Sequence, residues 1–177
     1  MQRGPNLACL AAVWLSILII ANVELRALLT PAEEHAAPDQ NLAIIVNLSN
    51  PVDGVSREEL RRIFLGERGH WANGRRITLV MMETERPERK ALLRDVCQMN
   101  ETEYNHRILH GLFTGELFTS PKTLASPTGV RKFIFNVPGA IGYLRATDVD
   151  GTVKVLRVDG RLPAAKDYPL HIDHPSK

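Results

Sequence analysis

Two histidines four positions apart are the first residues with metal-binding potential. His106 and His110 lie in a segment with helical periodicity, and side chains at this spacing share one face of a helix. Such a pair can supply two ligands to zinc. No glutamate follows His106 and no third ligand is evident, so the H-E-x-x-H motif is not met. We expect an exposed histidine pair and no metal site.

The segment Asp148-Val-Asp-Gly151 begins like a calcium-binding loop. The later ligand positions hold valines, whose side chains offer no oxygen, and the twelfth position is Asp159 rather than glutamate. We therefore predict a β-turn here.

The chain contains two cysteines, Cys9 in an apolar N-terminal stretch and Cys97 in the body. They are poor candidates for a disulfide, and Cys97 is predicted to be a small buried residue rather than a nucleophile. No nucleophile elbow, G-x-x-x-x-G-K loop or G-x-G-x-x-G motif is present. These observations argue against an enzyme and against a cofactor.

The charges of the chain are nearly balanced. The formal net charge is +2, and Lys and Arg alternate with Asp and Glu along the sequence. This pattern is typical of a solvated protein surface, and it gives no electrostatic reason to expect a nucleic-acid partner.

The N-terminus has the pattern of an export signal. Arg3 precedes an apolar run from Leu7 to Ala21, which is shorter than the about 20 residues of a membrane span. Residues 1–26 are interpreted as a cleaved signal peptide or an uncleaved membrane anchor, and both remain open. Residues 27–41 are interpreted as a linker, and residues 42–177 as the domain, placed in the periplasm or elsewhere outside the cytoplasm.

Periodicity predicts alternating strands and helices in that domain. Apolar runs at 41–47, 77–82 and 140–144 indicate strands, and residues 152–158 alternate as a half-exposed strand would. Helical patterns cover 56–66, 86–99, 100–113 and 126–137, with cap residues at Ser56, Asn100 and Ser126. This interleaving predicts an α/β fold with a mixed β-sheet flanked by helices.

Several stretches together resemble the second lobe of phosphate-type periplasmic substrate-binding proteins of ABC transporters. That family has a run of the kind N-P-x-N-P-V, a helix ending I-F-x-G, and W-x-x-G before a strand. "PGAIGYL" (138–144) and "VLRVDG" followed by "YPL" (168–170) are similar to later parts of the lobe. The residues matching the first three motifs are Asn47, Asn50, Pro51, Val52, Ile63, Phe64, Gly66, Trp71 and Gly74.

The resemblance covers residues 43–170 and implies one lobe of a type 2 periplasmic-binding-protein fold. Receptors of this kind trap ligand between two lobes, and the first lobe would have to lie before residue 43. In these receptors the glycine-containing strand closes the lobe, so Gly142 is expected to allow a close approach rather than to contact ligand.

The resemblance also locates a departure from the family. These receptors grip phosphate with a pattern like R-x-D-G-S-G-T just after the strand that matches 77–82. Here Met82 stands at the position of the arginine and Thr84 near that of the aspartate. Arg86, Pro87 and Glu88 replace Ser-Gly-Thr, so a proline removes an amide donor and a carboxylate enters the site.

Two functions follow as alternatives. The first is a non-catalytic exported binding domain with a degraded anion motif, in which Thr84, Arg86 and Arg89 are the candidate contacts for phosphate or another small anion. The second is a sensory or interaction module that binds a protein of the cell envelope. An uncleaved N-terminal segment would attach either one to the membrane.

Overall fold

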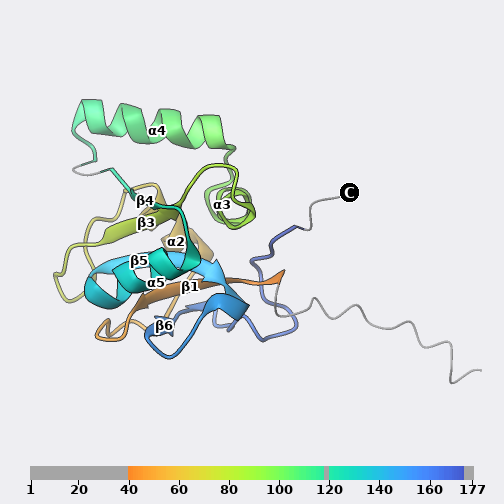
Figure 1. The fold of residues 1–177 in the computed structure, drawn as a ribbon. Helices are drawn as coiled ribbons and strands as arrows, with labels where there is room; N and C mark the ends of the chain where they lie inside the picture. The colour runs from red at the N-terminus through yellow and green to blue at the C-terminus, as the bar shows by residue number, and fades with distance from the viewer. Residues whose placement is uncertain (1–39, 118–119, 174–177) are drawn as a thin grey trace, which may run out of the picture. The chain divides into compact units, whose positions relative to one another are not determined.

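The fold is built on a mixed sheet of five strands in the order β4-β3-β5-β1-β6 (Figure 1). The computed structural model describes residues 40–117 and 120–173. The strands are β1 (Leu42–Asn47), β3 (Thr78–Met82), β4 (Lys122–Leu124), β5 (Ala140–Arg145) and β6 (Val153–Val155). The short strands β2 (Gly54–Val55) and β7 (Arg157–Val158) form a separate parallel pair.

Helices cover the sheet on both faces. They are α2 (Arg57–Phe64), α3 (Pro87–Leu92), the π-helical turn η3 (Leu93–Cys97), α4 (Glu101–Thr114), α5 (Pro127–Asn136) and the short η4 (Ala146–Asp148). Figure 1 shows α5 in front of β5 and β1, with α2 behind the sheet. The predicted α/β class, with a mixed sheet flanked by helices, is confirmed.

Strand direction decides which loops meet. β3 pairs in parallel with both β4 and β5, whereas β1 runs antiparallel to β5 and β6. The carboxyl ends of β3, β4 and β5 therefore lie together at one end of the strands, beside the amino end of β1. The loops that lead into α3 and α5 both begin at this end of the sheet.

Side chains with oxygen acceptors begin three of the helices. Ser56 accepts from the backbone amide of Glu59, and Ser126 accepts from that of Gly129. Asn100 and Glu103 form a reciprocal capping box at the start of α4. These caps satisfy amides that have no partner within the helix, which explains why the predicted starting points are correct.

Two residues of the family motifs hold loops to the sheet. The Asn47 side chain donates to the carbonyls of Ile134 and Phe135 at 2.9 and 2.6 Å and so fastens the end of α5 to β1. The indole of Trp71 is buried and donates to the carbonyl of Gly139 at 3.0 Å. Both residues are thus explained by packing and by hydrogen bonding to backbone.

Gly142 lies at a close contact between β5 and α5. A Cβ atom there would lie 2.9 Å from Cδ1 of Ile134 in α5 and 3.2 Å from both Cβ and the carbonyl oxygen of Val80 in β3. The absence of a side chain therefore lets α5 pack directly on the β3–β5 pair. The expected structural role of this glycine is confirmed.

The structure corrects three expectations. Residues 152–158 do not form one strand, because the chain leaves β1 at Leu156 and Arg157 then donates its amide to Asp53. The helix expected over 86–99 changes to a π-helical turn at Leu93 and ends at Gln98, which has a left-handed φ of 56°. The edge strand β4 was not predicted, because its sequence has neither an apolar run nor clear alternation.

The expected leader, residues 1–26, and nearly all of the expected linker, residues 27–41, lie outside the described part of the chain. Within residues 40–117 and 120–173, no helix is long and apolar enough to cross a membrane.

Substituting Gly142 by alanine should destabilise the fold. The added methyl group must displace Ile134 or widen the β3–β5 contact, so we expect a loss of about 1–3 kcal/mol in the free energy of unfolding. The control is Gly151→Ala, at an exposed turn where a Cβ meets nothing within 4 Å. Urea denaturation of both variants tests this, and equal stability of the two would contradict the packing argument.

Candidate functional site

The loop that follows β3 lies at the end of the sheet where the three parallel strands have their carboxyl ends. Thr84 and Glu85 in this loop are exposed, and Arg86 is half-buried. Glu85 adopts a left-handed φ of 69°, and its carboxylate accepts from Lys90 Nζ at 2.6 Å. The same ion pair lowers the pKa of the Glu85 carboxyl, chiefly through the hydrogen bond from Lys90.

The helix that follows this loop begins without a nest of amides. Arg86 is the N-cap and contributes no side-chain cap, and Pro87 at the first helical position has no N–H. α3 is also short, since it changes to the π-helical turn at Leu93. Backbone donors, which hold oxyanions in many binding loops, are therefore scarce at this position.

A carboxylate is buried at the same place. Glu88 is only 2% exposed, and its Oε1 accepts from Nε of Arg145, at the end of β5, at 2.6 Å. Its Oε2 lies 3.6 Å from Nε of Arg86. The carboxylate therefore sits between two guanidinium groups that come from different elements of the fold.

Arg89 lies deeper than its neighbours and is 5% exposed. Its guanidinium donates to both carboxylate oxygens of Glu101, at 2.9 and 2.6 Å, and to the carbonyl of Met82 at 2.8 Å. It also lies 5.7 Å from the ring centroid of Tyr104. Arg89 thus links the end of β3 to α3 and to the start of α4, and its donors face inward.

The core beside Arg89 holds neutral groups. Burial raises the pKa of Tyr104 and of Tyr143, whose hydroxyl oxygen accepts from the Met82 amide. Burial also raises the pKa of the Cys97 thiol to about 12. A thiol with this pKa is a poor nucleophile at neutral pH, so the prediction that Cys97 is a buried packing residue is confirmed.

Two hollows lie near α4. The larger, of about 530 Å³, includes Lys90, Arg94, Gln98 and Glu101 in its lining, and neither Thr84 nor Arg86 contributes to it. The smaller, of about 180 Å³, lies between α4 and β4, and Arg89 is one of its lining residues. Thr84, Arg86 and Arg89 therefore do not line either of these two hollows together.

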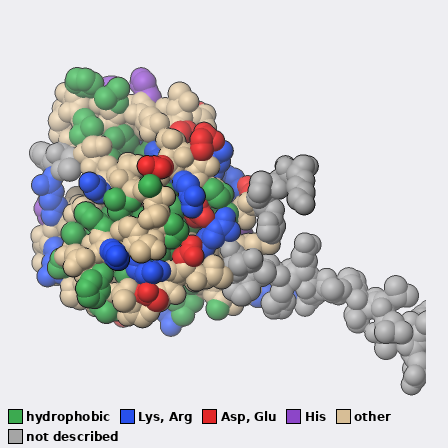
Figure 2. All heavy atoms as spheres, viewed as in Figure 1, with side chains coloured by type: hydrophobic (Ala, Val, Ile, Leu, Met, Phe, Trp, Pro, Cys, Tyr) green, Lys and Arg blue, Asp and Glu red, His purple; other side chains and the backbone are tan. Residues whose placement is uncertain are grey.

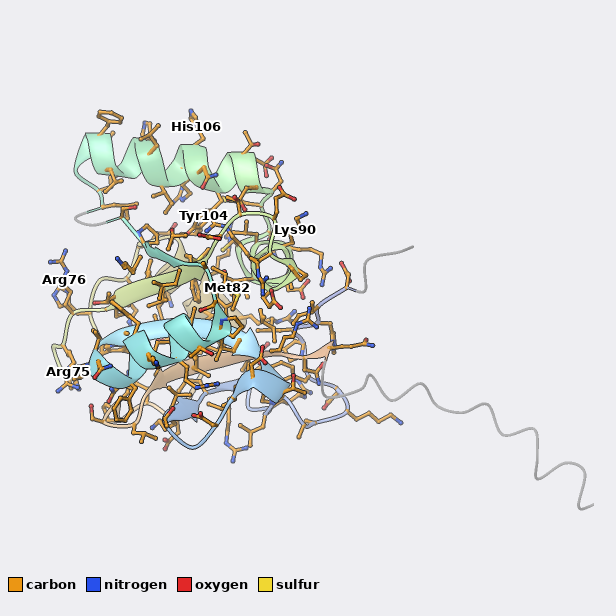
Figure 3. The ribbon with its side chains drawn as sticks, in the orientation of Figure 1. Arg75, Arg76, Met82, Lys90, Tyr104 and His106 are labelled. Atoms are coloured by element: carbon orange, nitrogen blue, oxygen red, sulfur yellow. The ribbon has the colours of Figure 1, made fainter. Side chains whose placement is uncertain are left out.

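The two histidines lie on the solvent side of α4. Both His106 and His110 are exposed, and Figure 3 shows His106 pointing away from the sheet whereas Tyr104 lies between α4 and the sheet. Among the described residues, no three side chains of His, Cys, Asp or Glu are placed to share a metal ion.

The turn predicted at residues 148–151 lies slightly later in the chain: η4 ends at Asp148, and the turn runs from Asp150 to Val153, whose amide donates to the Asp150 carbonyl. The Asp150 carboxylate accepts from the amide and the hydroxyl of Thr152 and pairs with Arg131 at 2.9 Å. These bonds lower the pKa of the Asp150 carboxyl, and those from Thr152 contribute most. The turn needs no cation to account for its conformation.

Comparison with known proteins supports the resemblance seen in the sequence. The chain is 29% identical over 147 residues to "Phosphate-binding protein PstS" of Bacillus subtilis (strain 168), an alignment that covers 77% of this chain and 44% of that protein. The chain is related to phosphate-binding receptors. No family model matches it.

Part of the fold of solved receptor structures is the same as the fold of this chain. An ABC-type phosphate transport receptor from Vibrio cholerae aligns with a TM-score of 0.60 at 18% identity, covering 77% of this chain and 58% of that one. PstS from Borrelia burgdorferi aligns with a TM-score of 0.58 at 14% identity, covering 75% and 55%. The chain spans about half the length of these relatives.

Sequence reasoning brought together Thr84, Arg86 and Arg89 but missed Arg145. The predicted contacts come from one loop and the helix after it, whereas Arg145 ends a strand 57 residues from Glu88. The parallel pairing of β3 and β5 brings Arg145 to the same end of the sheet. The sequence held a sign of this position, since an arginine directly after the apolar run 140–144 lies at the carboxyl end of that strand.

Replacing Arg89 by methionine should be strongly destabilising. The substitution removes the donor to the Met82 carbonyl and the bidentate partner of the Glu101 carboxylate, which keeps the hydrogen bond from the Asn105 amide, so we expect a loss of about 3 kcal/mol in the free energy of unfolding. Lys90→Met is the control, because Lys90 pairs with Glu85 in solvent and should change stability little. Urea denaturation measures both, and comparable losses would show that Arg89 has no special role.

Proposed function

We propose that the chain is a non-catalytic, extracytoplasmic binding-protein-like domain whose anion-binding motif is degraded. Relatedness to phosphate-binding receptors supports the binding-protein character. One observation carries the rest: at the carboxyl end of β3, where the resemblance places the anion grip, Glu88 buries its own carboxylate between two arginines. Like charges repel at such distances, so a second anion is disfavoured there.

Any remaining anion contact falls to the three candidate residues in different roles. Thr84 and Arg86 are accessible at the loop and would touch a small anion such as phosphate directly. Arg89 would act from beneath, because its guanidinium already holds the Met82 carbonyl and Glu101. The proposed contact set is therefore weaker than a loop of amides closed by an arginine.

The location and the lack of catalysis rest on different evidence. The apolar segment from Leu7 to Ala21 and the relationship to the receptors support export, with the domain at residues 42–177. The relatives are named for binding phosphate, which supports a role without catalysis. Because the chain spans about half of those relatives, transport activity of a whole receptor is not assigned to it.

Phosphate titrated into dialysed protein should produce no saturable heat up to millimolar concentration. The reason is the carboxylate of Glu88 at the expected anion position and the missing amide of Pro87. Calorimetry measures this directly, with the Bacillus subtilis phosphate-binding protein as the positive control. A saturable heat with one phosphate per chain would contradict the proposed degradation of the motif.

A second candidate function is protein–protein interaction in the cell envelope. α4 carries exposed apolar side chains: Leu109 is 54% and Phe113 is 84% exposed. Figure 2 shows hydrophobic side chains gathered over the carboxyl-terminal part of α4. Exposed apolar side chains grouped on one element are more typical of a contact surface than of a solvated one.

Replacing Phe113 by serine should weaken self-association or partner binding if α4 is such a surface. Light scattering over a concentration series is expected to give a dimer for the wild-type chain and a monomer for Phe113→Ser. Phe135→Ser is the matched control, because Phe135 is exposed on a different helix, α5. A wild-type chain that is strictly monomeric and captures no envelope protein would argue against this function.

A further inference from the structure

Glu88 has the surroundings of a bound anion rather than those of an ordinary surface acid. Its side chain is 2% exposed, whereas its two partners, Arg86 and Arg145, are 40% and 30% exposed. The positive groups thus face partly toward solvent, and the negative group lies beneath them.

The arrangement is also incompletely satisfied. Glu88 Oε2 and Arg86 Nε are both buried, and neither makes a hydrogen bond, although they lie 3.6 Å apart. Buried polar atoms in folded proteins are nearly always paired, so this mismatch calls for an explanation. The carboxylate reaches Arg145 at 2.6 Å but stays 3.6 Å from Arg86.

We propose that Arg86 and Arg145 form an oxyanion site that the chain fills with its own carboxylate, Glu88. The site takes small tetrahedral oxyanions, phosphate or sulfate, because their four oxygens can bridge two guanidinium groups that a two-oxygen carboxylate spans incompletely. Glu88 acts as a built-in competitor that keeps external anions out. This inference deepens the proposed function and rests on it.

The test removes the competitor and supplies the anion. Glu88→Ala in the full chain vacates both the space and the charge, so calorimetry should show phosphate or sulfate binding at least about tenfold tighter than to the wild-type chain. The same anions should raise the melting temperature of Glu88→Ala more than chloride does at equal ionic strength, and titrating phosphate and sulfate separately identifies the preferred ion. Adding Arg145→Gln to Glu88→Ala should abolish the gain.

Glu88→Gln provides a second measurement that does not depend on filling a cavity. It keeps the volume of the side chain and removes its charge, so its anion affinity should fall between those of the wild-type chain and Glu88→Ala. If Glu88→Ala does not fold, Glu88→Gln decides the question.

The proposal is overturned if the folded variants bind phosphate and sulfate no better than the wild-type chain does, or if the gain survives the loss of Arg145. Phosphate binding by the wild-type chain itself would be a different failure, since it would contradict the degraded motif whatever the variants do.

Discussion

The guanidinium of Arg89 is the interaction on which the arrangement around the candidate site depends. It joins three elements that follow one another in the chain: the last residue of β3 through the Met82 carbonyl, its own helix α3, and the first turn of α4 through Glu101. Tyr104 covers one side of the group and donates its hydroxyl to the carbonyl of Phe64. A buried cation needs such complete pairing because its desolvation is costly. The position of α4 and the path of the loop after β3 are therefore set together.

The arginines near the carboxyl end of β3 are neutralised by carboxylates of the same chain. Arg89 is matched by Glu101, and Arg145 and Arg86 are matched by Glu88. In a receptor that binds an external anion, positive groups or backbone amides in the site have no partner from the protein and are free to bind the anion. Here the chain supplies its own anions, and Pro87 removes an amide at the same position. The likeness to phosphate-binding receptors in fold thus coexists with an interior in which the positive groups already have partners.

Conserving a fold and conserving a site place different demands on a chain. The sheet is held by a continuous apolar core from β1, β3 and β5 and by polar anchors such as Asn47 and Trp71, whose side chains donate to the end of α5 and to Gly139. The close contact at Gly142 likewise concerns only the packing of α5 on the sheet. The ion pairs of this loop are therefore formed apart from the anchors that fix α5 and Trp71 to the sheet. The exposed apolar side of α4 is a further feature that the packing of the core leaves unexplained.

The sequence by itself determined the α/β class, most of the strands and the helix starts. These depend on local periodicity and on capping, which short windows reveal: Ser126 and Pro127 begin α5 as expected, and the run at 41–47 is a buried strand. Only the tertiary structure decided that residues 152–158 divide between two sheets, that β4 forms an edge strand, and that Arg145 meets Glu88. Each of these depends on pairing between segments far apart in the chain. Long-range packing also explains why Arg89 is buried whereas Thr84 and Arg86 are accessible. The burial of Arg89 follows from the docking of α4 and not from the local motif that contains it.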